Sequence, residues 1–159
     1  MSDQFHQHSF KVPKTARFYS TGSITSATKN VWLVLHGYGQ LVPFFIRHFK
    51  SIASDETVIV APEGLSRFYL EGTGGRVGAT WMTKEDRLDD IDDYEQYLDL
   101  VCRELEQLYS ISLSDKNLTL LGFSQGGATA TRWLNHTSVA VDQFVMWCSV
   151  FPPDMPADI

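Results

Sequence analysis

A continuous apolar run from Val31 to Leu35 constrains the fold of this chain more than any other feature of its sequence. A strand that is apolar on both faces belongs in the middle of a parallel sheet, because helices cover both sides of such a sheet. Further short apolar runs predict strands at residues 57–61, 118–121 and 143–150. Apolar residues at helical spacing predict intervening helices at residues 43–53, 88–109 and 128–135. This alternation predicts an α/β fold, a mostly parallel sheet with helices on both faces.

The length of the chain, 159 residues, suits a single domain that spans residues 1–159. Outside the expected core, two short strands are predicted at residues 8–12 and 16–20. The glycine-rich stretch 64–80 is expected to be a long loop, and such loops are usually functional or mobile. This stretch lacks the phosphate-binding pattern G-x-x-x-x-G-K, so no nucleotide or other cofactor is expected.

Negative charge is concentrated in one window of the sequence. The formal net charge is −6, and residues 85–95, with seven acidic residues and one basic residue, account for all of it. The rest of the chain is neutral and has no basic stripe, so nucleic acid is not an expected partner. The acidic window lacks the glycine and the distal glutamate of an EF-hand loop. It is therefore interpreted as the solvated start of a helix, and no metal site is predicted.

Cysteine usage and hydropathy favour a reduced, cytoplasmic protein. Cys102 and Cys148 both lie in apolar segments and are interpreted as reduced core residues, not as a disulfide or a zinc site. The longest aliphatic–aromatic run has five residues, whereas a membrane span needs about 20. The first residues carry neither a basic nor an apolar signal region. A cytoplasmic location without a membrane span is therefore expected.

A candidate catalytic serine follows the predicted strand at 118–121. Residues 122–126 read Gly-Phe-Ser-Gln-Gly, which matches the G-x-S-x-G pattern. The match lies between an apolar strand and a helix that opens with small residues, which is the setting of a nucleophile elbow. The flanking glycines permit a strained turn that holds the hydroxyl of Ser124 clear of the sheet. The alternative is a serine that merely caps the following helix.

A second glycine-rich turn follows the strand at 31–35, where residues 36–40 read His-Gly-Tyr-Gly-Gln. An oxyanion hole needs one N–H group after the nucleophile and another from the loop of a different strand. The N–H groups of Gln125 and Tyr38 are the candidates, although an ordinary strand-to-helix turn is the alternative. Both turns lie at the carboxyl ends of strands, where ligands bind in such sheets. His36 is interpreted as a buried histidine that bonds to backbone and holds this turn.

Together these residues resemble a known family. The resemblance is carried by Leu35 to Gly39, Ala61-Pro62, Trp81 and Gly122 to Gly127. They look like the motifs of the phospholipase/carboxylesterase family of α/β-hydrolases, which includes bacterial carboxylesterases and acyl-protein thioesterases. The resemblance implies a serine hydrolase that cleaves small-molecule carboxylic esters or thioesters through an acyl-enzyme. It implies Ser124 as the nucleophile and the amides of Tyr38 and Gln125 as oxyanion donors.

Two aromatic residues beside these motifs are candidates for substrate binding. Trp81 borders the glycine-rich stretch, and Phe151 follows the last predicted strand. Each is expected either to line an acyl pocket or to pack its own segment down.

The resemblance also indicates that catalytic partners are missing. α/β-Hydrolases place an acid and then a histidine after the serine in chain order, but only 35 residues follow Ser124. His136 is the only histidine among them, and it lies about 18 Å along the same helix, outside hydrogen-bond reach. Asp154 follows a strand but has no base to orient. The chain is therefore expected to be C-terminally incomplete, with its acid and base beyond Ile159 and little activity of its own.

Two other functions and one association remain open at this point. A catalytically inactive member of the fold would bind a small acyl ligand or a partner in the same cleft. An acyltransferase would use the same serine, with an alcohol in place of water. The apolar strand at 143–150 would end the sheet if no strand follows it, and such an edge predicts self-association.

Overall fold

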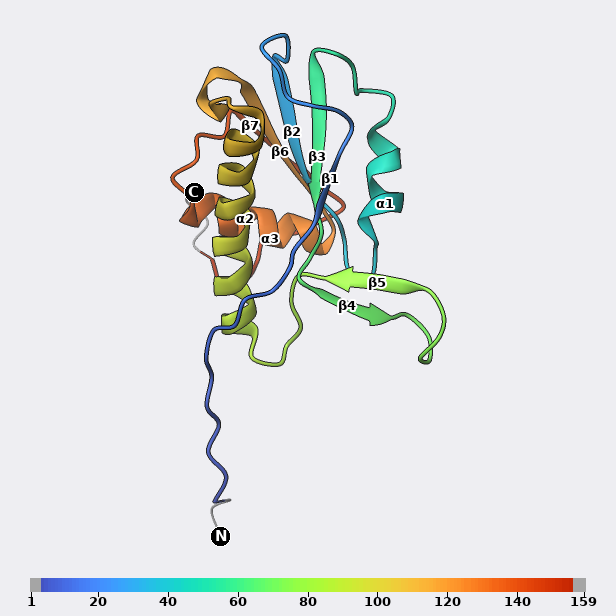
Figure 1. The fold of residues 1–159 in the computed structure, drawn as a ribbon. Coiled ribbons are helices and arrows are strands. Elements are labelled where there is room, and N and C mark those ends of the chain that lie inside the picture. Colours follow the sequence, from blue (N-terminus) through green and yellow to red (C-terminus); the bar gives the residue numbers. More distant parts are fainter. Residues whose placement is uncertain (1–3, 156–159) are drawn as a thin grey trace.

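The sheet at the centre of the molecule is mostly parallel, as the sequence predicts. The computed structural model describes residues 4–155, and its strands lie between helices (Figure 1). Five strands form the sheet in the order β1-β3-β2-β6-β7. They are β1 (Phe18–Ser20), β2 (Asn30–Leu35), β3 (Thr57–Pro62), β6 (Asn117–Phe123) and β7 (Gln143–Trp147). Only β1 runs antiparallel to its neighbour, which is β3.

Helices cover both faces of this sheet (Figure 1). On one face lie α2 (Arg87–Tyr109) and α3 (Gln125–His136), and on the other lie α1 (Val42–Phe45) and the 3₁₀ helix η1 (Ile46–Phe49). Alternate side chains of β2 pack against the helices on opposite faces of the sheet, because successive side chains of a strand point to opposite faces. Leu33 and Leu35 belong to the larger core with α2, and Val34 belongs to the smaller core with Phe45 of α1. The run that is apolar on both faces is thus buried on both, as predicted.

The larger core depends on the apolar faces of α2 and α3. Leu98 and Leu105 of α2 and Trp133 of α3 are almost fully buried. The indole N–H of Trp133 donates a hydrogen bond of 2.9 Å to Asp99, which ties α3 to α2. Burial of one such side chain contributes about 1.5–3 kcal/mol, so this face fixes the helix that follows the candidate serine. None of the helices within residues 4–155 is long and apolar enough to cross a membrane.

The N-terminal segment differs from its prediction. Residues 8–12 form no strand but an extended arm that runs beside α2. Lys11 anchors this arm, because its Nζ lies 2.6 Å from Asp93 and 3.1 Å from Asp92. The side chain of Phe10 is 83% exposed. The alternating apolar residues of the arm therefore have neither a neighbouring strand nor a core to join.

The glycine-rich stretch 64–80 is not one long loop. It contains an antiparallel hairpin of β4 (Ser66–Tyr69) and β5 (Val77–Thr80), which forms a separate two-stranded sheet. The backbone of Gly39 and Gln40 in the second glycine-rich turn bonds to Ala79 of β5. The hairpin is thus fixed by contacts with the turn at 36–40, and no local sequence pattern predicts contacts between such distant segments.

The remaining differences concern the ends of elements. The predicted helix at 43–53 is α-helical only to Phe45 and continues as the tighter η1. The aromatic rings of Phe45 and Phe49 meet edge to face, with centroids 5.3 Å apart. A second 3₁₀ helix, η2 (Leu113–Asp115), precedes β6. The last strand ends at Trp147 because Cys148 has a φ of 49°, which is incompatible with an extended strand.

The two cysteines occupy different environments. Cys102 on α2 is buried, as predicted, and burial raises the pKa of its thiol to about 12. Cys148 is exposed, so its interpretation as a core residue is wrong. The apolar run that suggested a buried position ends one residue earlier, where the chain leaves the sheet.

Candidate active site

Ser124 occupies a strained turn between β6 and α3. Its backbone has φ 53° and ψ −117°, a conformation that residues other than glycine rarely adopt. Gly122 and Gly126 flank it where the backbone is most crowded. A Cβ atom on Gly122 would collide with the carbonyl of Gly126, and one on Gly126 would collide with the carbonyls of Leu35 and His36. The predicted strand, turn and helix are therefore all present, and the side chain of Ser124 is exposed.

The end of β7 holds this turn in place. The N–H of Ser124 donates a 3.0 Å hydrogen bond to the carbonyl of Trp147. The carbonyl of Ser124 accepts one bond of 2.7 Å from the hydroxyl of Ser149 and one of 2.9 Å from the N–H of Gly127. Both backbone groups of the strained residue are thus satisfied, which lets the structure keep a conformation that would otherwise relax.

The turn at 36–40 is built around a neutral, buried histidine, which confirms the interpretation of His36. Its Nδ1–H donates to the carbonyl of Gly37 at 2.8 Å, and its Nε2 accepts the N–H of Gly64 at 2.9 Å. Burial lowers the pKa of His36, the hydrogen bond to Gly37 opposing it in part. The imidazole is therefore committed to backbone groups and is not free to act as a base.

The structure brings the two glycine-rich turns together. A Cβ atom on Gly37 would lie 3.2 Å from the Cβ of Ser124. Within residues 4–155, neither the N–H of Tyr38 nor that of Gln125 donates to a protein acceptor. Two unpaired backbone donors beside an exposed serine are the arrangement that could bind a developing oxyanion.

The two candidate substrate residues lie in different surroundings. The indole of Trp81 is 3% exposed. It stacks on His36 with ring centroids 5.0 Å apart, and its Nε1–H donates to the carbonyl of His36 at 2.8 Å. These contacts favour the packing alternative for Trp81. Phe151 is 53% exposed and follows Val150, which lines an open depression beside Ser124.

Neither Asp154 nor His136 hydrogen-bonds to Ser124; each has other partners. Asp154 bonds to Arg87 at 2.7 Å and to Arg132 at 3.0 Å, and these two guanidinium groups lower the pKa of its carboxyl to about 2. His136 lies at the far end of α3, with its ring nitrogens 3.3 Å from Glu95 and from Asp99. Among residues 4–155, no side chain hydrogen-bonds to the hydroxyl of Ser124.

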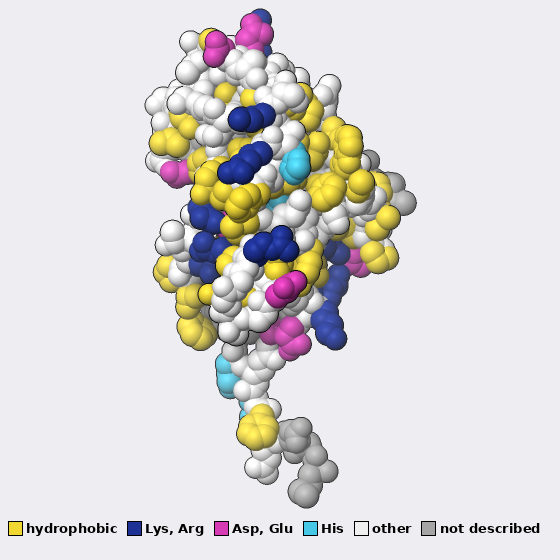
Figure 2. Space-filling view, turned by 90° about the vertical axis from the view of Figure 1, so that its right-hand side faces the viewer, with side chains coloured by type: hydrophobic (Ala, Val, Ile, Leu, Met, Phe, Trp, Pro, Cys, Tyr) yellow, Lys and Arg dark blue, Asp and Glu magenta, His cyan; other side chains and the backbone are white. Residues whose placement is uncertain are grey.

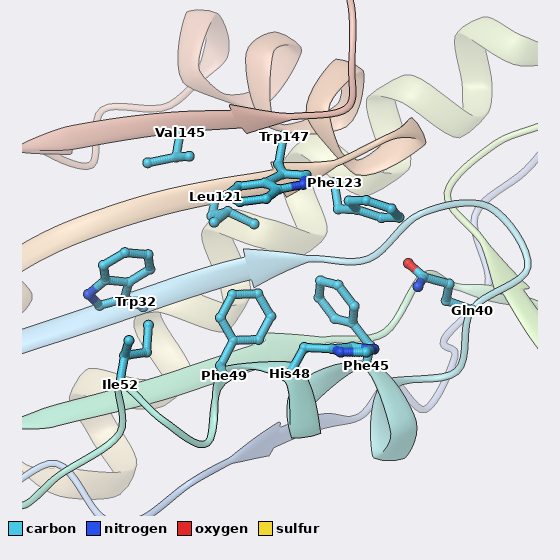
Figure 3. A pocket seen from close by; sticks show the side chains of 10 residues that line it. All are labelled: Trp32, Gln40, Phe45, His48, Phe49, Ile52, Leu121, Phe123, Val145 and Trp147. Atoms are coloured by element: carbon cyan, nitrogen blue, oxygen red, sulfur yellow. The ribbon is translucent and has the colours of Figure 1, made fainter.

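A separate apolar groove of about 480 Å³ crosses the α1 face of the sheet. Figure 3 shows its side chains, which come from β2, β6, β7, α1 and η1 and their flanking turns. They are Trp32, Gln40, Phe45, His48, Phe49, Ile52, Leu121, Phe123, Val145 and Trp147. Hydrophobic side chains gather on the side of the molecule that carries α1 (Figure 2). The depression that contains Ser124 is distinct from this groove, and it is lined by Ser124, Gln125, Ala128, Cys148, Ser149 and Val150.

Sequence reasoning missed one contact set in this region. The side-chain amide of Gln125 bonds to Thr80, the last residue of β5, and to Trp81 and Met82, which come directly after it. The G-x-S-x-G pattern leaves the residue after the serine free, so the pattern carries no signal for this side chain.

The chain is similar in fold to solved esterase structures. It aligns with the crystal structure of esterase PE8 at a TM-score of 0.64 and 22% identity, over 87% of this chain and 66% of that one. Zea mays acyl-protein thioesterase 2 aligns at a TM-score of 0.58 and 21% identity, over 87% and 64% of the two chains. The Bacillus cereus carboxylesterase aligns at 0.59 and 19%, over 88% and 63%. The chain thus spans about two thirds of the length of these proteins.

No curated protein sequence matches the chain significantly. The family model of the phospholipase/carboxylesterases, in contrast, matches residues 20–155. That span includes strands β2 to β7, the last residue of β1, both glycine-rich turns and the helices α1, α2 and α3. Together with the mostly parallel sheet and its α/β-hydrolase-like neighbours, this match identifies the chain as a member of the phospholipase/carboxylesterase family of α/β-hydrolases.

Proposed function

We propose that Ser124 is the nucleophile of a serine hydrolase that cleaves carboxylic esters or thioesters through an acyl-enzyme. The observation that carries this proposal is the strained, exposed Ser124 beside two unpaired backbone N–H groups. Family membership supports a hydrolase of the esterase type. Because the chain spans about two thirds of the length of its solved relatives, the activity of the whole protein is part of the proposal.

In the proposed mechanism, Oγ of Ser124 attacks the carbonyl carbon of the substrate and its proton passes to a general base. The amides of Tyr38 and Gln125 donate to the resulting oxyanion, which would contribute about 10²–10³ in rate for each donor. The bond to the leaving oxygen or sulfur then breaks as that atom takes up the proton, and water releases the acyl group. Phe151 remains the candidate for contact with the substrate, because it is exposed next to the depression that holds Ser124.

We further propose that the general base lies outside residues 4–155, because none of their side chains bonds to the hydroxyl of Ser124. Loss of a triad member leaves a residual rate from the oxyanion hole and from binding. We therefore expect the chain 1–159 to be acylated slowly and to turn over poorly. The alternative, a catalytically inactive binding protein, predicts no acylation at all.

The cytoplasmic location expected from the sequence stays a prediction.

The proposal is tested by intact-protein mass spectrometry after incubation with p-nitrophenyl acetate. One added acetyl group, absent from Ser124→Ala and retained in the matched control Ser51→Ala, is the expected result. Ser51 is an exposed serine outside both glycine-rich turns, so it reports labelling of serines in general. Acetylation that persists in Ser124→Ala would refute the nucleophile assignment. Complete absence of acetylation in the unmodified chain would favour the binding protein.

A second proposal concerns the partner of β7. This strand is at one end of the sheet and pairs only with β6 among the strands that the structure describes. It carries Phe144, Val145, Met146 and Trp147 and no charged residue. An apolar edge strand is a template for pairing with another chain, so we propose self-association through β7.

A further inference from the structure

A short segment at the end of the β4–β5 hairpin connects the two turns that carry the candidate oxyanion donors. We call residues 79–82 the brace. We propose that the side chain of Gln125 is a positioning residue that acts through the brace to set the separation of the Tyr38 and Gln125 amides. This inference rests on the proposed function, because it concerns the geometry of the same oxyanion site.

On one side, the brace holds the start of α3 through the side chain of Gln125. Its Oε1 accepts the N–H of Trp81 at 3.1 Å. Its Nε2 donates to the carbonyl of Met82 at 2.9 Å and to the hydroxyl of Thr80 at 3.0 Å. The Thr80 hydroxyl donates in turn to Met82 O at 2.8 Å, so it is free to accept from Gln125. All three bonds reach across 43 to 45 residues of sequence.

On the other side, the brace holds the residues that flank Tyr38. The N–H of Gly39 donates to the carbonyl of Ala79 at 2.8 Å, and the N–H of Ala79 donates to the carbonyl of Gln40 at 2.9 Å. The indole N–H of Trp81 donates to the carbonyl of His36 at 2.8 Å. The residues on both sides of Tyr38 are therefore held by Ala79 and Trp81, in the same short segment whose Thr80, Trp81 and Met82 hold Gln125.

A glutamine suits this position because the brace offers donors and acceptors side by side. The amide must accept from one N–H and donate to one carbonyl, which neither a carboxylate nor an apolar side chain can do. The backbone N–H of Gln125 belongs to the same residue, so a change in how the side chain is held also moves that N–H. Catalysis is sensitive to such displacements, since about 1 Å can cost about 10²-fold.

The test compares Gln125→Met, which keeps the length of the side chain but loses its hydrogen bonds, with the unmodified chain 1–159. Acylation of Ser124 by p-nitrophenyl acetate is followed over a range of ester concentrations. We expect the maximal acylation rate constant to fall between about 10- and 100-fold. The half-saturating ester concentration is expected to stay unchanged, because the backbone donors act on the oxyanion and not on the neutral ester. The matched control is Gln96→Met, a glutamine on α2 that bonds to Asp92 and is expected to acylate normally.

A second variant and a second measurement keep the test independent of activity and of folding. Trp81→Phe keeps an aromatic ring against His36 but loses the indole N–H that donates to the carbonyl of His36. This variant should also lower the maximal acylation rate constant. NMR-detected hydrogen exchange should show faster exchange of the Gly39 and Ala79 amides in Gln125→Met, by more than the fall in its urea midpoint accounts for. A lower urea midpoint with unchanged acylation would indicate a merely structural role and overturn the inference.

Failure of the proposed function would give a different result from failure of this inference. If the unmodified chain is not acylated, the hydrolase proposal fails, and hydrogen exchange alone decides whether Gln125 holds the turn at 36–40. Unchanged exchange at Gly39 and Ala79 in Gln125→Met, in a folded protein, would overturn the inference on its own.

Discussion

Replacement of Ser124 by glycine is expected to make the protein more stable than replacement by alanine. At φ 53° and ψ −117°, any residue with a Cβ atom is strained, whereas glycine is not. The hydroxyl of Ser124 bonds to no side chain among residues 4–155, so its removal alone should change the free energy of unfolding by less than about 0.5 kcal/mol. Ser124→Ala therefore removes the hydroxyl and keeps the strain, and Ser124→Gly removes both.

The magnitude follows from two opposing terms. A residue held in such a sparsely populated conformation costs about 1–3 kcal/mol. Glycine lowers the free energy of unfolding by about 0.5–1 kcal/mol relative to alanine, because it increases the conformational entropy of the unfolded chain. The midpoints of these two ranges differ by roughly 1 kcal/mol, and Ser124→Gly should exceed Ser124→Ala by that amount in the free energy of unfolding. For a domain of this size, 1 kcal/mol corresponds to about 2–4 °C in Tm.

Urea denaturation followed by tryptophan fluorescence, with thermal melts as a second measurement, would detect this difference. The matched control is Ser66 in β4, an exposed strand residue with ordinary backbone angles. There Gly should be less stable than Ala by about 0.5–1 kcal/mol, the opposite sign. If Ser124→Gly proves no more stable than Ser124→Ala, the turn is not strained and the reasoning is wrong.

Three further predictions concern the surroundings of this turn. Gly126→Ala should destabilise the fold by about 1–3 kcal/mol in urea denaturation, whereas Gly74→Ala, where a Cβ atom meets no neighbour, should change it by less than about 0.5 kcal/mol. Because the pKa of His36 is lowered by burial in the folded state, stability should fall as the pH drops below about 6.5, and urea midpoints should show a shallower fall in His36→Gln. Light scattering should show self-association of the chain that Val145→Lys on β7 weakens; a monomer before the substitution would contradict the proposed edge pairing.

The parts of the fold that the sequence predicts are those where one segment determines its own environment. The run at 31–35 is apolar on both faces, so it must lie inside the sheet, and it does. Ser124 is similar, because the turn forms only with glycine two residues before it and two residues after it. Gly122 and Gly126 have no room for a Cβ atom. Only glycine lacks this atom, so the two glycines in the sequence already indicate the tight turn.

The parts that the sequence does not predict depend on contacts between distant segments. The arm at 8–12 has the alternation of a strand, but a strand needs a partner and this segment lies beside α2 instead. The hairpin of β4 and β5 joins segments with four glycines in or between them, and its β5 strand gains bonds from Gly39 and Gln40. The sequence left open whether Trp81 lines a substrate pocket or packs its own segment, and its stacking on His36 favours packing.

The strain at Ser124 needs contacts from distant segments to maintain it. A backbone in an unfavourable conformation persists only where its surroundings leave it no alternative. Three separate segments constrain this turn: the end of β7 and the residues after it through Trp147 and Ser149, the end of β2 through its close approach to Gly126, and the brace through Gln125. The glycines that permit the strain are visible in the sequence, whereas the side chains that maintain it, Ser149 and Gln125, have ordinary identities. Residues that hold a strained site are therefore best found by tracing the hydrogen bonds of the strained residue and its neighbours outward.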